Sequence, residues 1–298
     1  MAELGPDYIA NLREALSIFY ADLGKFYKDQ ANAPGPTSQA ANEQATFQRP
    51  ESLVTAWSIA TLLIESGGEH VTAFVKTITE PVEPIAAWTC VRSMLESCAL
   101  ASWLLDPGID ATARVGRVFA LRFEGLEQQL KFGRVAGVSD SELEATKKRI
   151  DDAEQVALNE GYPVVVNSRG KRIGIGQQMP SATEVIHLML GEEPKYRLLS
   201  AVAHGHSWAI LQLGFKRVTD HPRGVRIGGV PVSGFEKTAY IEGMSLLGLL
   251  AARALARPVW HQCSYFGWNK AQLKVLLDSA FDKLRATASV RFWRSPSS

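Results

Sequence analysis

The sequence IAAWTCVRSMLESCALASWLL, residues 85–105, decides the fold class because only two of its side chains, Arg92 and Glu96, are charged. A helix that is apolar on nearly every side is buried, either in a protein core or in a bilayer. A charge near the centre of a membrane costs about 2.5 to 3.5 kcal/mol, and both charges lie near the middle of the segment. We therefore expect the central helix of a soluble bundle, with Arg92 and Glu96, four residues apart, on one face of that helix.

The composition is that of an ordinary globular protein. Of 298 residues, 46% are hydrophobic and 21% are charged, and the net charge is +1. This balance does not demand a nucleic acid or a membrane as partner. The N-terminus lacks a basic start followed by an apolar run, and three sparse cysteines without metal-ligand spacing are typical of reduced thiols. We expect a cytoplasmic protein with no metal and no cofactor.

Apolar residues recur at spacings of three and four along most of the chain, which predicts a mainly all-α helical bundle. We expect an N-terminal helix within residues 1–31, a flexible linker or loop over the polar residues 32–50, and a bundle domain over 51–298, with Gly67 and Gly68 as a candidate helix break. Alternating apolar residues around glycine turns predict a small inserted β-hairpin or ribbon near 162–176 and 219–232. A very short turn joins the helix of residues 110–135 to the central helix, which favours an antiparallel pair. Ser139 and Glu142 predict a capping box at the start of the next helix, residues 139–160.

Polar residues suited to acid–base catalysis lie on two predicted helices. Arg197, Ser200 and His204 are spaced by three and four residues, so they share one helix face. A histidine beside a carboxylate and arginines can act as a general acid or base, and the cations can stabilise a phosphate-centred transition state. The predicted catalytic residues are His204, Arg197, Glu96 and Arg92.

The predicted strands add a second group of cations. If the two turn regions pair, their arginines form one basic ribbon that suits phosphate groups; otherwise they are two independent glycine turns. The antiparallel helix pair would place Arg114 and Arg117 opposite Glu96. The predicted substrate-binding residues are Arg117, Arg114, Ser200, His206, Arg169, Arg172, Arg223 and Arg226.

The segment YRLLSAVAHG, residues 196–205, follows a helix that contains RSMLES, residues 92–97. This pattern resembles the HEPN superfamily and its uncharacterised bacterial relatives. The resemblance implies a helical bundle that acts as a homodimer and cleaves RNA without a metal, as an endoribonuclease of the toxin or phage-defence type. It also implies that Arg197 and His204 are the motif pair and that Glu96 is the acidic residue of the earlier helix.

Two other functions are compatible with the sequence. One is a non-catalytic helical binding or scaffold protein, a homo-oligomer in which the Arg, Glu and His network is buried and structural. The other is a small-molecule pocket with Trp88, Trp103 and Trp208 as apolar walls. Solvent access to His204 distinguishes a catalytic role from a structural one, because a substrate must be able to reach a catalytic histidine.

Overall fold

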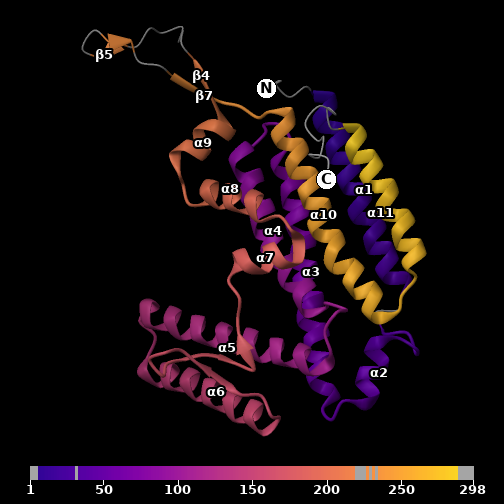
Figure 1. Cartoon of the computed structure of the whole chain (residues 1–298). Coiled ribbons are helices and arrows are strands. Elements are labelled where there is room, and N and C mark those ends of the chain that lie inside the picture. The colour runs from indigo at the N-terminus through magenta and orange to yellow at the C-terminus, as the bar shows by residue number, and fades with distance from the viewer. Residues whose placement is uncertain (1–5, 31–32, 219–225, 228–229, 232–233, 288–298) are drawn as a thin grey trace.

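The computed structural model describes residues 6–30, 33–218, 226–227, 230–231 and 234–287, and within them eleven helices dominate (Figure 1). The helices are α1 (Pro6–Asp29), α2 (Gln39–Thr46), α3 (Pro50–Thr77), α4 (Pro84–Leu104), α5 (Ala111–Ala136), α6 (Asp140–Asn159), α7 (Ala182–Leu190), α8 (Glu193–Ala203), α9 (Ser207–Gly214), α10 (Ile241–Phe266) and α11 (Lys270–Thr287). The predicted mainly α fold is confirmed. None of these described helices is both long and apolar enough to cross a membrane.

Helix α4 is the centre of the bundle. It packs against α3 and α10 on one side and against α7 and α8 on the other, while α1 and α11 lie together beyond α10 (Figure 1). Val91, Met94 and Leu95 of α4 have no exposed surface. Each buried side chain of this kind stabilises the fold by about 1.5 to 3 kcal/mol relative to an exposed one. The prediction that residues 85–105 form the core helix is therefore confirmed.

Helix α3 is continuous through Gly67 and Gly68, where the sequence suggested a break. Both glycines are buried and permit close packing of neighbouring helices. A Cβ atom on Gly67 would lie 2.7 Å from the sulfur of Cys98 in α4, and one on Gly68 would lie 2.6 Å from the ring of Tyr20 in α1. The missing side chains serve helix packing here, not a turn.

The prediction of a flexible linker over residues 32–50 is wrong for residues 39–46, which form helix α2. Ser38 caps this helix by accepting a hydrogen bond from the backbone N–H of Ala41 at 3.1 Å. The side chain of Ala40 is fully buried, and α2 packs against α3 and α10. The segment has little apolar surface, so its structure depends on contacts with distant helices.

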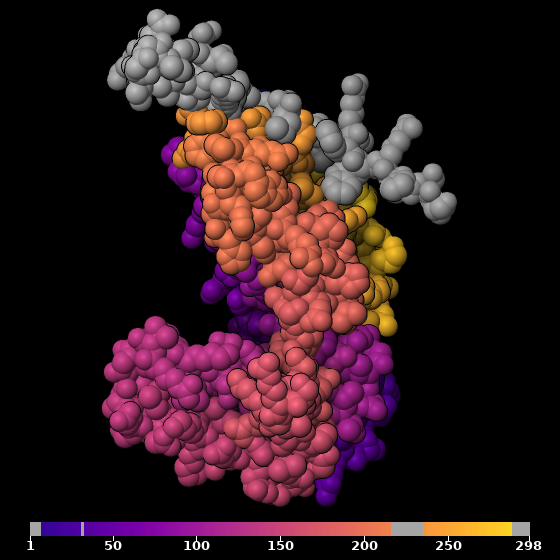
Figure 2. All heavy atoms as spheres, turned by 60° about the vertical axis from the view of Figure 1, so that its left-hand side comes forward, coloured from indigo at the N-terminus to yellow at the C-terminus, as the bar shows by residue number. Residues whose placement is uncertain are grey.

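Helices α5 and α6 form a lobe, residues 111–159, that extends away from the long axis of the bundle (Figure 1). Ser139 and Glu142 form a capping box at the start of α6, as the sequence predicts. The predicted antiparallel packing of α5 along α4 is wrong, because α5 packs mainly against α6 and α3. Figure 2 shows the surface hollowed where this lobe meets the rest of the chain.

The described strands form three small antiparallel sheets. Strands β1 (Val164–Val166), β2 (Arg172–Ile175) and β3 (Gln177–Gln178) pair in that order beside α5. Strand β4 (Phe215–Val218) pairs with β7 (Gly234–Lys237), and β5 (Arg226–Ile227) pairs with β6 (Val230–Pro231) in a ribbon that projects from the other end of the molecule (Figure 1). The single basic ribbon predicted from both turn regions is therefore wrong.

Candidate functional site

A tight turn between α7 and α8 creates the first part of the candidate site. Gly191 caps the C-terminal end of α7, with a φ of 68° that is easily adopted only by a residue without a Cβ, and Pro194 lies in the first turn of α8. Buried Glu192 between them forms salt bridges with Lys195 and with Arg253 of α10, the latter at 3.7 Å. These contacts hold the start of α8 against α10.

Glu193 joins a histidine and an arginine across this turn. Its Oε2 atom lies 3.2 Å from Nδ1 of His187, and its Oε1 atom accepts a hydrogen bond from Nε of Arg197 at 2.9 Å. The Nη2 atom of Arg197 is 2.7 Å from the same oxygen. The side chains of His187 and Arg197 are 65% and 67% exposed, so both are accessible to a ligand.

A second polar cluster lies between α4 and α8. Nη2 of Arg92 is 2.9 Å from Oε1 of Glu96, Nε of Arg92 donates to Oγ of Ser200 at 3.2 Å, and the hydroxyl of Tyr196 donates to Oε1 of Glu96 at 2.6 Å. Burial and then the bond to the carboxylate raise the pKa of Tyr196, which keeps the phenol protonated as a donor. The structure thus brings together Arg92, Glu96 and Ser200 as predicted, but the two charged side chains are 22% and 31% exposed.

His204 and His206 lie at the opposite end of α8. His204 is the exposed C-cap of α8, and His206 is the exposed N-cap of α9. Seven residues separate His204 from Arg197, or about 10 Å along the helix axis. The contacts of Glu96 within the described part of the chain are with Arg92 and Tyr196, and they do not reach His204. The predicted acid and imidazole are therefore not in contact.

Arg114 and Arg117 do not face Glu96, which corrects the prediction from helix pairing. The fully buried Arg114 donates from Nη1 to the carbonyl of Leu104 at 2.5 Å. Arg117 donates to the carbonyl of Trp103, and its guanidinium lies 3.6 Å from the carboxylate of Asp106. The last carbonyls of a helix lack partners and carry partial negative charge, so these cations satisfy the end of α4.

The surroundings of Arg114 form a structural network far from His204. Its guanidinium lies 3.8 Å from the ring centroid of Tyr265, whose hydroxyl donates to Glu43 at 2.6 Å. Nearby, Nδ1 of His261 lies 3.0 Å from the carbonyl of Ser102. Burial is the main cause that lowers the pKa of His261, because it penalises the charged imidazole. A buried Arg, Glu and His network therefore exists, but not with the residues predicted.

The predicted arginines of the first turn region lie apart from this surface. Arg172 is paired with Glu154 and with Asp151, the latter at 3.3 Å, and its guanidinium lies over Phe123 in the α5–α6 lobe. Exposed Arg169 lies in the turn between β1 and β2. Arg226 belongs to β5 in the projecting ribbon, and Arg223 lies outside the described residues. The structure does not bring Arg169 or Arg172 together with Arg197 or His204.

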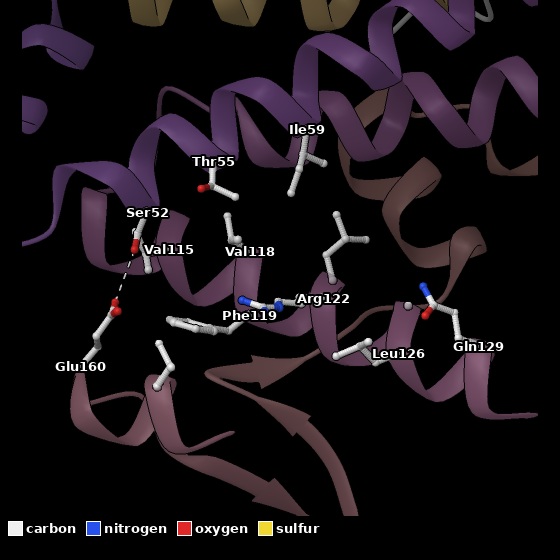
Figure 3. Close-up of a pocket in the computed structure, with 13 residues that line it drawn as sticks. Ser52, Thr55, Ile59, Val115, Val118, Phe119, Arg122, Leu126, Gln129 and Glu160 are labelled. Carbon is white, nitrogen blue, oxygen red and sulfur yellow. Dashed lines mark hydrogen bonds between the residues drawn. The ribbon is translucent and has the colours of Figure 1, made fainter. Parts of the chain in front are cut away.

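Two cavities flank the α5–α6 lobe. A cavity of about 690 Å³ is lined by carboxylates from three helices, Glu96, Glu124 and Glu184, with Gln178 and Ser181. A second, of about 390 Å³, lies between α3, α5 and α6, with Arg122 beside an apolar floor (Figure 3). Among the described residues, no group of three His, Cys, Asp or Glu side chains is arranged to hold a metal.

The pocket walled by three tryptophans is not formed. Trp88 and Trp103 are only 2% and 4% exposed and belong to the core, whereas Trp208 of α9 is 55% exposed. None of the three lines either cavity beside the α5–α6 lobe. Tryptophans at helical spacing are here mainly core residues.

Sequence reasoning missed His187, Glu193 and Tyr196 as members of the candidate site. The signal for the first two is the order His187, Gly191, Glu193 and Pro194: a glycine stop and a proline start make a short helical turn that brings the flanking polar residues together. No family model matches the chain, and neither the curated proteins nor the solved structures include a significant match.

Proposed function

We propose that the chain is a metal-independent endoribonuclease of the toxin or phage-defence type, with His204 as general acid or base and Arg197 as the group that stabilises phosphate charge. The observation that carries this proposal is the accessibility of both side chains on α8. A nuclease residue must reach the backbone of a bulky polymer, and Arg197 and His204 meet that condition. The resemblance of residues 196–205 to the HEPN pattern supports the same assignment.

Metal-independent cleavage of RNA needs few groups. The ribose 2′-hydroxyl attacks the adjacent phosphorus, a base accepts its proton, an acid protonates the leaving 5′-oxygen, and a cation stabilises the charge that develops on the phosphate. Arg197 uses Nε and Nη2 for Glu193, whereas Nη1 has no hydrogen-bond partner among the described residues. Its free edge is suited to a phosphate oxygen.

Exposed aromatic side chains near the end of α8 support RNA as the substrate. Trp208 of α9 and Phe235 of β7 are each 55% exposed, and α9 packs against both α8 and β4, the partner of β7. Exposed aromatic rings stack on unpaired bases with about 1 to 3 kcal/mol per base. We also propose that the enzyme acts as a homodimer, in which a second chain adds a second Arg197 and His204 surface.

The test is cleavage of a mixed RNA pool by purified protein in excess chelator. We expect the parent to cleave and His204→Ala to lose at least 100-fold in rate, as general acid–base catalysis contributes about 10² to 10⁴-fold. His70→Ala is the matched control, because His70 is a half-buried histidine of α3 outside the site. Equal cleavage by His204→Ala and the parent would refute the assigned role, provided that circular dichroism shows both proteins folded.

The second candidate is a non-catalytic binding or scaffold protein. It is favoured by one observation: Arg92 and Glu96 bond to Ser200 and Tyr196, and so join α4 to α8 rather than orient His204. A structural cluster of this kind would serve a binding surface equally well. Sedimentation of the parent with labelled single-stranded RNA distinguishes the two functions, because stable binding without any cleavage in the presence or absence of chelator supports the binding protein.

A further inference from the structure

We propose that His187, held by Glu193, is the general base that works with Arg197 on the same phosphodiester. This inference rests on the proposed ribonuclease function and adds a catalytic residue to it. The observation behind it is that one carboxylate, that of Glu193, contacts both the imidazole of His187 and the guanidinium of Arg197.

The orientation of Arg197 decides which histidine shares its ligand. Its guanidinium bonds to Glu193, four residues earlier, and is therefore turned toward the N-terminal end of α8. His187 lies at that end, whereas His204 lies at the opposite end of the helix. Within one chain, a phosphate on the free Nη1 edge of Arg197 thus lies on the side of His187.

The contact with Glu193 also sets the chemistry of the imidazole. Nδ1 of His187 lies 3.2 Å from Oε2 of Glu193, and a carboxylate can only accept a hydrogen bond, so this contact favours the tautomer with the proton on Nδ1. In the neutral ring Nε2 then has the lone pair, and the side chain is 65% exposed, which leaves this nitrogen accessible. A carboxylate that fixes the tautomer and orientation of a histidine is the arrangement that general bases use in catalytic triads.

Local structure fixes the carboxylate itself. Glu193 is the first residue of α8, where the helix dipole favours a negative charge, and Arg197 is its i+4 partner on the helix surface. Gly191 and the salt bridges of Glu192 set the turn that carries it. Glu193 therefore holds His187 and Arg197 in place before any substrate binds.

One bond to phosphorus forms and one breaks in the cleavage step. The 2′-oxygen of the ribose forms a new bond to phosphorus while its proton passes to Nε2 of His187. The bond between phosphorus and the 5′-oxygen breaks, and the 5′-oxygen takes a proton from the protonated His204 of the second chain in the proposed dimer. Water then carries the proton from His187 back to His204, and the products are a 2′,3′-cyclic phosphate end and a 5′-hydroxyl end.

The experiment measures single-stranded RNA cleavage by the full chain in chelator, for the parent and for H187A, H204A and the control H70A. We expect H187A to lose at least 100-fold in kcat. Cleavage by the parent with unchanged kcat in H187A overturns this inference while the ribonuclease stands. A parent that cleaves no RNA overturns both proposals. Loss in H187A with full activity in H204A supports His187 and refutes the role of His204.

Glu193 is tested as a positioning residue. We expect Glu193→Ala to lower kcat about tenfold with little change in KM, and Glu193→Asp to recover part of the loss, because the carboxylate orients the base and does not bind RNA itself. The ¹⁵N chemical shifts of His187 provide a readout that does not depend on activity. A neutral ring protonated on Nδ1 in the parent but mixed in Glu193→Ala supports the inference, and equal tautomer populations in the two proteins overturn it.

Discussion

Replacing Arg114 by Met removes a charge at the end of α4 whose side chain has no exposed surface. The side chain donates to the carbonyls of Leu104, Asp106 and Ile109 at 2.5, 3.2 and 3.3 Å, and its Nε atom lies 3.5 Å from the carboxylate of Glu43. Methionine has a similar length and fills most of the space, but it donates no hydrogen bond. The substitution therefore leaves three carbonyls and one carboxylate without their cation.

The expected loss in the free energy of unfolding is about 3 to 5 kcal/mol, the usual cost of removing one partner of a buried ion pair. Hydrogen bonds to a charged group contribute about 1.5 to 3 kcal/mol each, so two of the three carbonyl bonds suffice to account for it. For a chain of this size the melting temperature falls by roughly 2 °C per kcal/mol, which gives a decrease of about 6 to 10 °C. Urea unfolding followed by circular dichroism measures the free energy directly.

A double-mutant cycle separates the stranded charge from the lost packing. Glu43→Gln combined with Arg114→Met removes the unpaired carboxylate, which is only 13% exposed, so the double variant is expected to be less unstable than the sum of the single variants by at least 1 kcal/mol. Arg285→Ala is the control, because its pair with Asp282 is exposed and is worth less than about 1 kcal/mol. A loss in Arg114→Met no larger than that in Arg285→Ala would refute the structural role.

Three further predictions concern stability. Because the pKa of His261 is lowered in the folded protein, the unfolded chain binds a proton at this histidine first as the pH falls. The contribution of His261 to the free energy of unfolding is therefore present above about pH 6.5 and is lost below it, by up to about 1.4 kcal/mol per pH unit. His261→Asn should flatten this slope in urea unfolding measured from pH 7.5 to 5, and an unchanged slope would contradict the prediction. Gly67→Ala should destabilise the protein by about 1 to 3 kcal/mol, although alanine has the better helix propensity, because the new Cβ meets the sulfur of Cys98. Adding Cys98→Ala should recover much of the loss in thermal melts, and a stabilised Gly67→Ala variant would show that this contact is not tight. Arg92→Ala should cost only about 1 kcal/mol, because its pair with Glu96 is partly exposed, and a loss above 3 kcal/mol would restore the buried-pair interpretation.

Local sequence patterns predicted the features that depend on the geometry of a single helix. The scarcity of charge in residues 85–105 identified α4 as the core, and the spacing of Arg92 and Glu96 predicted that they share a face, where they form a salt bridge. Ser139 and Glu142 predicted the start of α6 because a capping box needs only four adjacent residues. Each of these inferences uses distances that helix geometry fixes.

Partners that are distant in sequence could not be predicted in the same way. Glu43 lies in a polar stretch without apolar periodicity, so the sequence does not indicate that it pairs with Arg114, 71 positions later. The contact of His187 with Glu193 depends on how two short helices meet at Gly191. The partners of a charged side chain depend on how distant helices meet. The spacing of apolar residues and the composition of the chain do not specify that geometry.

One set of contacts explains both the wrong prediction for α5 and the cavity beside it. An antiparallel α5 would need to run back along α4, but Arg114 and Arg117 at its start are engaged with the carbonyls that end α4. Their guanidinium groups fix the first turns of α5 at the end of the bundle, from which the helix extends outward to pack on α6. The faces of α4 and α7 that α5 does not cover, with Glu96 and Glu184, line the cavity of about 690 Å³. The buried arginines thus shape the surface beside the candidate site, although they take no part in its chemistry.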